Sequence, residues 1–259
     1  MKVRKYKDFD TLYKELIREI LMNPNEMIDF NTSELGYVNN MFVACKTYNC
    51  DLDLGVFGYS KNKWGHLLKT YVDYERLLEF YEKLHKVSGL SFTYDFKRKY
   101  INNGSCLLEC VLTRKERHKT WTEAHILYRT TELQRRFAAD LCLIHHFMKE
   151  LPEDICDIQR VYFYMPQCYV SGMFINGFYE YFEVPYETLD LEHKWTRTLY
   201  NTWKRSFQPD SKLTTFMTQR KMQELALGIK TYPPMLCRDL PGIKGFFDEY
   251  NKKQKGKGE

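Results

Sequence analysis

A cluster of polar residues follows an apolar run, and its side chains are of the types that can bind a phosphate and a nucleobase. The apolar run ends at residue 128, and after it come Arg129, Thr130, Glu132 and, eleven positions beyond the arginine, Asp140. A guanidinium and a hydroxyl donate to phosphate oxygens, and a carboxyl hydrogen-bonds to the polar edge of a base. A charged turn that leads into a capped helix contains the same residue types. On the residues alone, a recognition site and a charged turn both remain open.

A cysteine and a glutamine–tyrosine pair lie on strand-like runs on either side of this cluster. Cys106 is the second residue of the run at 105–113, and Gln167 and Tyr169 alternate along a later run. A thiolate is a nucleophile when its pKa is lowered, commonly by a nearby arginine. Alternate residues of a strand lie on one side, so the pair lines a pocket or forms a polar surface row. Cys106 is either a nucleophile or a core thiol, because its neighbours are apolar.

Hydrophobic periodicity predicts the elements that position these residues. Helical spacing is found at 8–22, 71–86 and 132–150, and strand-like runs are found within 41–57 and at 90–96, 105–113, 121–129, 160–165 and 168–175. A tight turn is expected at 102–104, and mostly helix is expected after Pro185. Because neither a repeat nor a linker divides the chain, we predict a single α+β domain at 1–250 with a basic disordered tail at 251–259.

Composition and charge exclude some classes of protein. The chain has a net charge of +5 and no run of eighteen apolar residues, so no membrane span or membrane partner is predicted. The charged N-terminal segment lacks an apolar signal, so a cytoplasmic protein is expected. Eight cysteines are then expected to be reduced thiols. Because no Cys-x-x-Cys pair occurs, we predict no metal site.

The order of these features resembles the thymidylate synthase and pyrimidine nucleotide hydroxymethylase family. There a strand carries a nucleophilic cysteine, the next strand ends in Arg-Ser-x-Asp, a helix carries Asn or Asp eleven residues after that arginine, and a later strand carries His-x-Tyr. The matching positions here are Cys106, then Arg129, Thr130 and Glu132, then Asp140, and finally Gln167 with Tyr169. The match covers about residues 70–175, and the interval from the arginine to the aspartate fits without gaps.

This resemblance implies a thymidylate synthase-like mixed sheet packed with helices, in a homodimer. It also implies transfer of a one-carbon unit from 5,10-methylenetetrahydrofolate to C5 of a pyrimidine 5′-monophosphate. The implied roles are Cys106 as nucleophile and Arg129 and Thr130 as phosphate ligands, with Glu132 beside them. Asp140 would read the base, Gln167 and Tyr169 would bind the sugar, and an aspartate at position 140 favours cytosine over uracil, as in the family's cytidylate hydroxymethylases.

Two other hypotheses stand beside the enzyme. The arginine pair that a partner subunit contributes to the phosphate in the family is absent here, and the family's catalytic glutamate has no match within 50–70. Both departures favour a non-catalytic relative that binds a nucleotide, a nucleic acid or a protein. Arg136 also stands where the family has a glycine. The 39 lysine and arginine residues, together with 20 tyrosines, are compatible with a nucleic-acid binder if they form one patch.

Overall fold

The computed structural model describes residues 3–22, 27–30, 34–37, 41–55, 57–96, 106–133, 136–170 and 233–255. The helices are α1 (Phe9–Met22), α2 (Lys61–Tyr71), α3 (Tyr74–Leu84), α4 (Arg136–Lys149), the 3-10 helix η4 (Cys237–Asp239) and α8 (Ile243–Lys255). The strands are β1 (Arg4–Tyr6), β2 (Met27–Phe30), β3 (Glu34–Tyr37), β4 (Met41–Cys45), β5 (Ser91–Asp95), β6 (Leu107–Thr113), β7 (Trp121–Tyr128), β8 (Thr131–Glu132), β9 (Cys156–Met165) and β10 (Cys168–Val170). None of these helices is long and apolar enough to cross a membrane.

The strands form one large mixed sheet and one small one. The large sheet has the order β1-β4-β9-β7-β6-β5, in which β1–β4 and β7–β9 are parallel and the other neighbours are antiparallel. The small sheet has the order β2-β3-β10-β8. The predicted α+β class with a mixed sheet and packed helices is confirmed. The predicted strands at 105–113 and 121–129 are β6 and β7, and they are adjacent.

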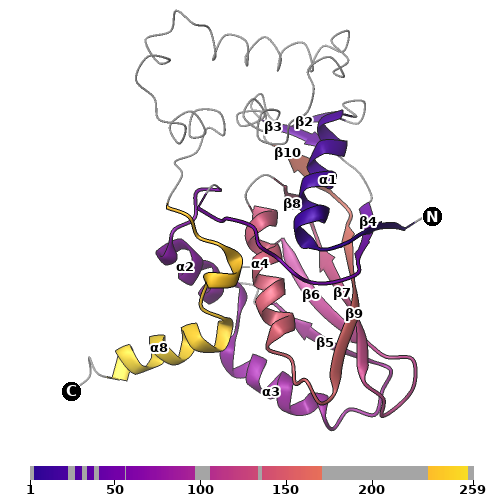
Figure 1. Cartoon of the computed structure of the whole chain (residues 1–259), viewed down its shortest axis with the longest axis vertical. Helices are drawn as coiled ribbons and strands as arrows, with labels where there is room; N and C mark the ends of the chain where they lie inside the picture. Colours follow the sequence, from indigo (N-terminus) through magenta and orange to yellow (C-terminus); the bar gives the residue numbers. More distant parts are fainter. Residues whose placement is uncertain are drawn as a thin grey trace, which may run out of the picture.

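The helices pack on one face of the large sheet (Figure 1). Phe163 of β9 lies between two helices, with its ring centroid 5.4 Å from Phe9 of α1 and 6.1 Å from Phe137 of α4. Further along α4, Phe147 lies 5.3 Å from Tyr94 of β5. Because side chains alternate across a strand, these contacts place α1 and α4 on the same side, where the buried apolar residues form the core.

The opposite face of the sheet carries a row of aromatic side chains, Phe42, His125, Tyr162 and Tyr164. The ring of Phe42 stacks on Tyr164 at 4.3 Å, and the ring of His125 stacks on Tyr162 at 4.7 Å. Tyr164 is 38% exposed.

One helix that lines the site described below was missing from the sequence prediction. Helix α2 begins after Ser60, whose side chain accepts a hydrogen bond from the backbone N–H of Lys63, as an N-cap does. Its buried positions include Trp64, Leu67, Leu68 and Tyr71, which have helical spacing. The signal was therefore present in the sequence, within a region to which no element was assigned there.

The expected disordered tail is wrong for its first residues. Helix α8 continues through Lys255, because its apolar side is anchored on the fold. Ile243 and Phe247 are buried, and Tyr74 of α3 stacks on Phe247 at 4.8 Å and donates to Asp248 at 2.9 Å. Residues 256–259, the expected turn at 102–104 and the region expected to be helical at 186–232 lie outside the described residues.

Candidate functional site

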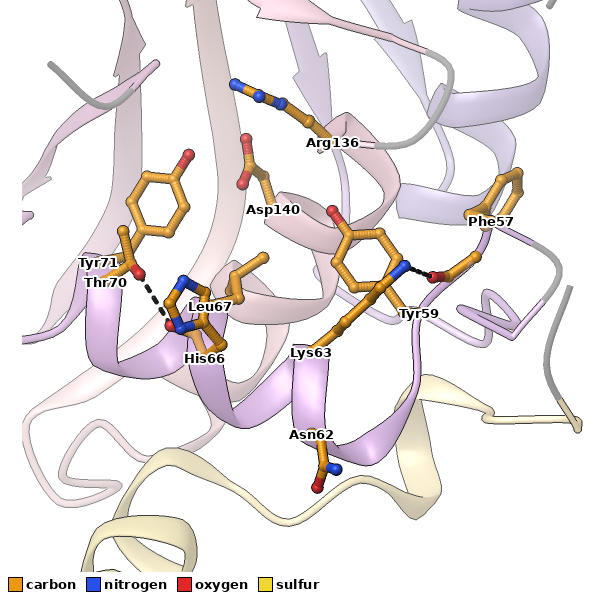
Figure 2. Close-up of a pocket in the computed structure, with 11 residues that line it drawn as sticks. Phe57, Tyr59, Asn62, Lys63, His66, Leu67, Thr70, Tyr71, Arg136 and Asp140 are labelled. Carbon is orange, nitrogen blue, oxygen red and sulfur yellow. Dashed lines mark hydrogen bonds between the residues drawn. The ribbon is translucent and has the colours of Figure 1, made fainter. Parts of the chain in front are cut away.

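A cavity of about 790 Å³ lies between α2 and the first turns of α4 (Figure 2). Its volume is within the range of small-molecule sites. The turn before α2 contributes Phe57, Gly58 and Tyr59; α2 contributes Asn62, Lys63, His66, Leu67, Thr70 and Tyr71; and α4 contributes Arg136 and Asp140.

The cavity has a buried floor and a cationic rim. Asp140 and Tyr71 are buried, with exposed fractions of 1% and 9%. Lys63, His66 and Arg136 are exposed. In Figure 2 the side chains of Tyr71, Asp140 and Arg136 extend toward the same part of the cavity. A ligand that enters from solvent would therefore meet positive charge first and the carboxyl group last.

Asp140 is the most unusual group in this site. Neither of its carboxyl oxygens has a hydrogen-bond partner among the described residues. Burial raises the pKa of the Asp140 carboxyl well above its ordinary value, the Arg136 guanidinium lowers it in part, and the charge on Glu132 raises it further. A neutral carboxyl offers one donor and one acceptor side by side. Leaving such a group unpartnered costs about 1–3 kcal/mol, and a ligand that pairs with it would recover this energy.

The turn that carries Phe57 and Tyr59 is held by a segment from the C-terminal part of the chain. Asp53 accepts hydrogen bonds from the backbone N–H groups of Gly55 at 2.9 Å and Met235 at 2.7 Å. The Lys63 ammonium donates to the Gly58 carbonyl at 2.7 Å. Gly58 has φ of 79°, a backbone conformation that L side chains rarely adopt. This wall of the cavity is therefore braced from two sides.

Three of the residues predicted for the site come together at the end of β6 and β7. The sulfur of Cys106 lies 3.6 Å from the hydroxyl of Thr130. The backbone N–H of Arg129 donates to the Cys106 carbonyl at 2.9 Å. Cys106 is buried, Thr130 is half-buried and Arg129 is exposed. The strand pairing thus places the predicted nucleophile beside the predicted phosphate ligands.

Two phenols connect this group to Asp140. Burial raises the pKa of Tyr71, and the nearby Asp140 and Cys106 raise it further. Burial likewise raises the pKa of Tyr128 well above its ordinary value, and the same carboxyl and thiol contribute. The thiol and the carboxyl therefore lie near the same two rings. However, Cys106 and Arg129 are not among the described residues that line the cavity.

The other predicted residues have backbone or capping interactions in this region. Glu132 is buried, and its carboxylate accepts from the backbone N–H of Arg136 at 3.4 Å, which caps α4. The Gln167 carbonyl accepts from the N–H of Thr131 at 2.8 Å. Tyr169 pairs with Glu132 in the parallel ladder of β10 and β8, and its side chain lies outside the described residues. The capped-helix interpretation is thus confirmed for Glu132.

Several lining residues were missed in the sequence because they belong to α2. Helix α2 has its buried residues at helical spacing, so a helix at 60–71 could have been predicted from the sequence. That helix would have placed Lys63, His66 and Tyr71 in one element. Arg136 was noted only as a departure from a family pattern. Within the part of the chain that the structure describes, Asp140 is the sole carboxylate lining the cavity.

Comparisons with known proteins were made for the chain and for its fold. No protein-family profile matches the sequence, and no curated protein matches it either. Among solved structures, the fold is similar to thermostable thymidylate synthase A from Bacillus subtilis, with a TM-score of 0.42 and 10% sequence identity over 68% of this chain and 84% of that chain. Because this similarity is low, the function proposed below is argued from the residues that line the cavity.

Proposed function

We propose that the protein binds a pyrimidine 5′-monophosphate, with the base at Asp140 and the phosphate at Arg136 on the cavity rim and at Arg129 and Thr130 next to Cys106. The observation that carries this proposal is a buried carboxyl with two unpartnered oxygens in a cavity with a cationic rim. A neutral carboxyl can donate to N3 of cytosine and accept from its 4-amino group. This pairing supports the preference for cytosine that the sequence resemblance implies.

The phosphate is assigned to Arg129 and Thr130, with Arg136 as a second guanidinium. Arg129 and Thr130 adjoin Cys106, and Arg136 lines the cavity one turn before Asp140. A guanidinium binds phosphate with two parallel hydrogen bonds. Arg136 would in this way take the place of an arginine from the pair that is absent in the sequence.

Arg129→Ala and Arg136→Ala are each expected to weaken binding of a pyrimidine 5′-monophosphate by about 1.5–3 kcal/mol, the range for hydrogen bonds to charged groups. Affinity for the nucleoside should stay unchanged, because it has no phosphate. Isothermal calorimetry with cytidine and uridine nucleotides measures both. Arg76→Ala is the control, since Arg76 is exposed on α3 and pairs with Asp95 at 3.4 Å. Equal affinity of the wild type for nucleoside and nucleotide would refute the phosphate assignment.

We further infer that Cys106 acts as a nucleophile in one-carbon transfer to C5. Its thiolate would add to C6 of the base, and the electron pair of the C5–C6 double bond would make C5 nucleophilic. C5 would then bond to the one-carbon unit as that unit's bond to a donor nitrogen breaks and the nitrogen takes up a proton. The C5 proton would leave to water, and the thiolate would be expelled from C6 as the C5–C6 double bond re-forms. The contact between the Cys106 sulfur and the Thr130 hydroxyl, and the hydrogen bond from the Arg129 N–H to the Cys106 carbonyl, support this role.

5,10-Methylenetetrahydrofolate is the cofactor implied by the sequence resemblance, and the groups lining the cavity fit its chemistry. The half-buried ring of Tyr59 offers a flat surface for a pterin, and Lys63 offers a cation for the anionic tail. When bound, the cofactor supplies the one-carbon unit. The chain's own residues would orient it against the base and exclude water.

A specific observation also favours a second function, nucleotide binding without catalysis. Among the described residues, Cys106 does not line the cavity, and Asp140 is the one carboxylate that does. A binding protein needs the carboxyl and the cations but not a reactive thiol. The tritium-release experiment argued in the Discussion separates the two functions.

A homodimer is also proposed, with the aromatic row of Phe42, His125, Tyr162 and Tyr164 at the subunit interface. Tyr164→Glu is expected to shift the protein from dimer to monomer, because it places a charge in an apolar contact. Sedimentation velocity at micromolar concentration measures this shift. Leu78→Glu is the matched control, since Leu78 is 37% exposed on α3 and Tyr164 is 38% exposed. A wild-type protein that sediments as a monomer would contradict the proposal.

A further inference from the structure

Three buried cysteines from distant parts of the sequence converge at one point in the core. Cys50 follows β4, Cys142 lies in α4 and Cys237 begins η4. Their sulfur atoms all lie within 4.8 Å of one another, and the sulfurs of Cys50 and Cys142 are 3.7 Å apart. The cysteines are 3%, 0% and 0% exposed. No role in nucleotide binding is assigned to any of them.

The spacing of these sulfurs matches the coordination shell of a thiophilic metal ion. In a tetrahedral zinc site the Zn–S distance is about 2.3 Å, which places neighbouring sulfurs about 3.8 Å apart. The 3.7 Å separation of Cys50 and Cys142 agrees with this value. A disulfide would join two of the sulfurs and leave the third beside them, whereas an ion engages all three.

We propose that Cys50, Cys142 and Cys237 form a binding site for Zn²⁺, with one further donor completing the coordination. Thiolate ligands select Zn²⁺ over harder divalent cations. All three sulfurs bind as thiolates, so each cysteine that is still a thiol releases its proton to solvent when the ion binds. The sequence prediction of no metal site relied on the absence of a Cys-x-x-Cys pair. That criterion misses the site proposed here, because each ligand comes from a different segment.

Hydrogen bonds hold two of the ligand segments in place around α4. Next to Cys142, the His145 ring nitrogen Nδ1 lies 2.8 Å from the Tyr48 carbonyl, and the His146 nitrogen Nε2 lies 3.0 Å from the Cys237 carbonyl. The Cys237 N–H donates to the Leu52 carbonyl at 2.9 Å. Such contacts around the ligands orient them before the ion binds.

The proposed ion would stabilise a wall of the cavity. Met235, two residues before Cys237, donates its backbone N–H to the Asp53 carboxylate and accepts a hydrogen bond from the backbone N–H of Leu54. The segment at Asp53 and Leu54 leads directly into the turn with Phe57 and Tyr59. An ion bound by both Cys237 and Cys142 would therefore fix the segment around Met235, which supports this wall of the cavity, to α4.

The test measures metal in the full chain, purified under reducing conditions, by inductively coupled plasma mass spectrometry. The wild type is expected to hold about one zinc per chain, as a single closed site does. Co²⁺ added after chelation should give the charge-transfer absorption of cobalt–thiolate bonds. Cys50→Ser, Cys142→Ser and Cys237→Ser should each lose most of the zinc and this absorption. Cys110→Ser should keep both, because Cys110 is equally buried but lies outside the cluster.

A second measurement covers variants that fail to fold. Removing zinc from the wild type with a chelator should lower the melting temperature, and Zn²⁺ but not Mg²⁺ should restore it. The proposal is overturned if folded wild type with titrated free thiols binds neither Zn²⁺ nor Co²⁺. Loss of metal in Cys110→Ser equal to that in Cys50→Ser would also overturn it, as would a Cys50–Cys142 disulfide in protein prepared without oxygen.

Discussion

Replacing Cys106 by serine is expected to abolish the release of tritium from C5 of a pyrimidine 5′-monophosphate incubated with 5,10-methylenetetrahydrofolate. The wild type should release tritium to water, because addition of the thiolate at C6 and bond formation at C5 expel that hydrogen as a proton. A serine hydroxyl is a far weaker nucleophile at neutral pH, so the rate should fall by a factor on the order of 10³ to 10⁶.

The affinity for the nucleotide should change little in this variant, because the thiol contributes to the reaction more than to ground-state binding. Cys110→Ser is the matched control, since Cys110 is a buried cysteine on β6, the strand that directly follows Cys106. Its tritium release should equal that of the wild type. If the wild type binds nucleotide but releases no tritium from either a cytosine or a uracil nucleotide, the enzyme is excluded and the non-catalytic function stands.

Asp140→Asn is expected to remove a large pH dependence from the stability of the protein. The pKa of Asp140 is raised in the folded state by burial, so the native state keeps a proton that the unfolded state has lost. Between the unfolded pKa, about 4, and the raised native value, the wild-type free energy of unfolding should therefore fall as pH rises, by up to about 1.4 kcal/mol per pH unit. An amide does not titrate, so the variant should lose the contribution of Asp140 to this slope, while the smaller contributions of Asp10 and Glu150, whose pKa values burial also raises, should remain.

Urea unfolding followed across this pH range measures the difference between the two proteins. Asp154→Asn is the control, because Asp154 is an exposed aspartate that lies 3.6 Å from His85. Its unfolding free energy should follow the wild-type curve. Parallel curves for the wild type and Asp140→Asn would show that the carboxyl is not held neutral in the fold, and the proposed donor–acceptor pairing with a base would then be wrong.

Elements with a strong local pattern were predicted correctly from the sequence. The helix expected at 8–22 is α1, and the helix expected at 132–150 is α4 with its start moved to Arg136. The start moved because Glu132 pairs in β8 and then caps the helix with its carboxylate. The expected strands β6 and β7 are also present, since alternating apolar residues report directly on a half-buried strand.

The sequence also predicted that Cys106, Thr130 and Asp140 would lie in one region, but it did not predict how their side chains are buried or which elements surround them. The strand order predicted that Cys106 would approach Thr130, and their side chains are 3.6 Å apart. That Asp140 is buried without a partner, and that α2 forms the opposite wall of its cavity, depends on how α2 packs against α4. A pattern in one segment reports which of its faces is buried but not which other segment covers that face.

By itself, the sequence determined the α+β class and most of the elements, and it predicted Cys106, Arg129, Thr130 and Asp140 as candidate site residues. Only the tertiary structure decided that Lys63 and Arg136 share a cavity with Asp140, and that Cys50, Cys142 and Cys237 meet. The physical reason is that helix and strand patterns arise from contacts between near neighbours in the chain. Sites such as these are made by long-range packing, which brings together residues whose local patterns are independent of one another.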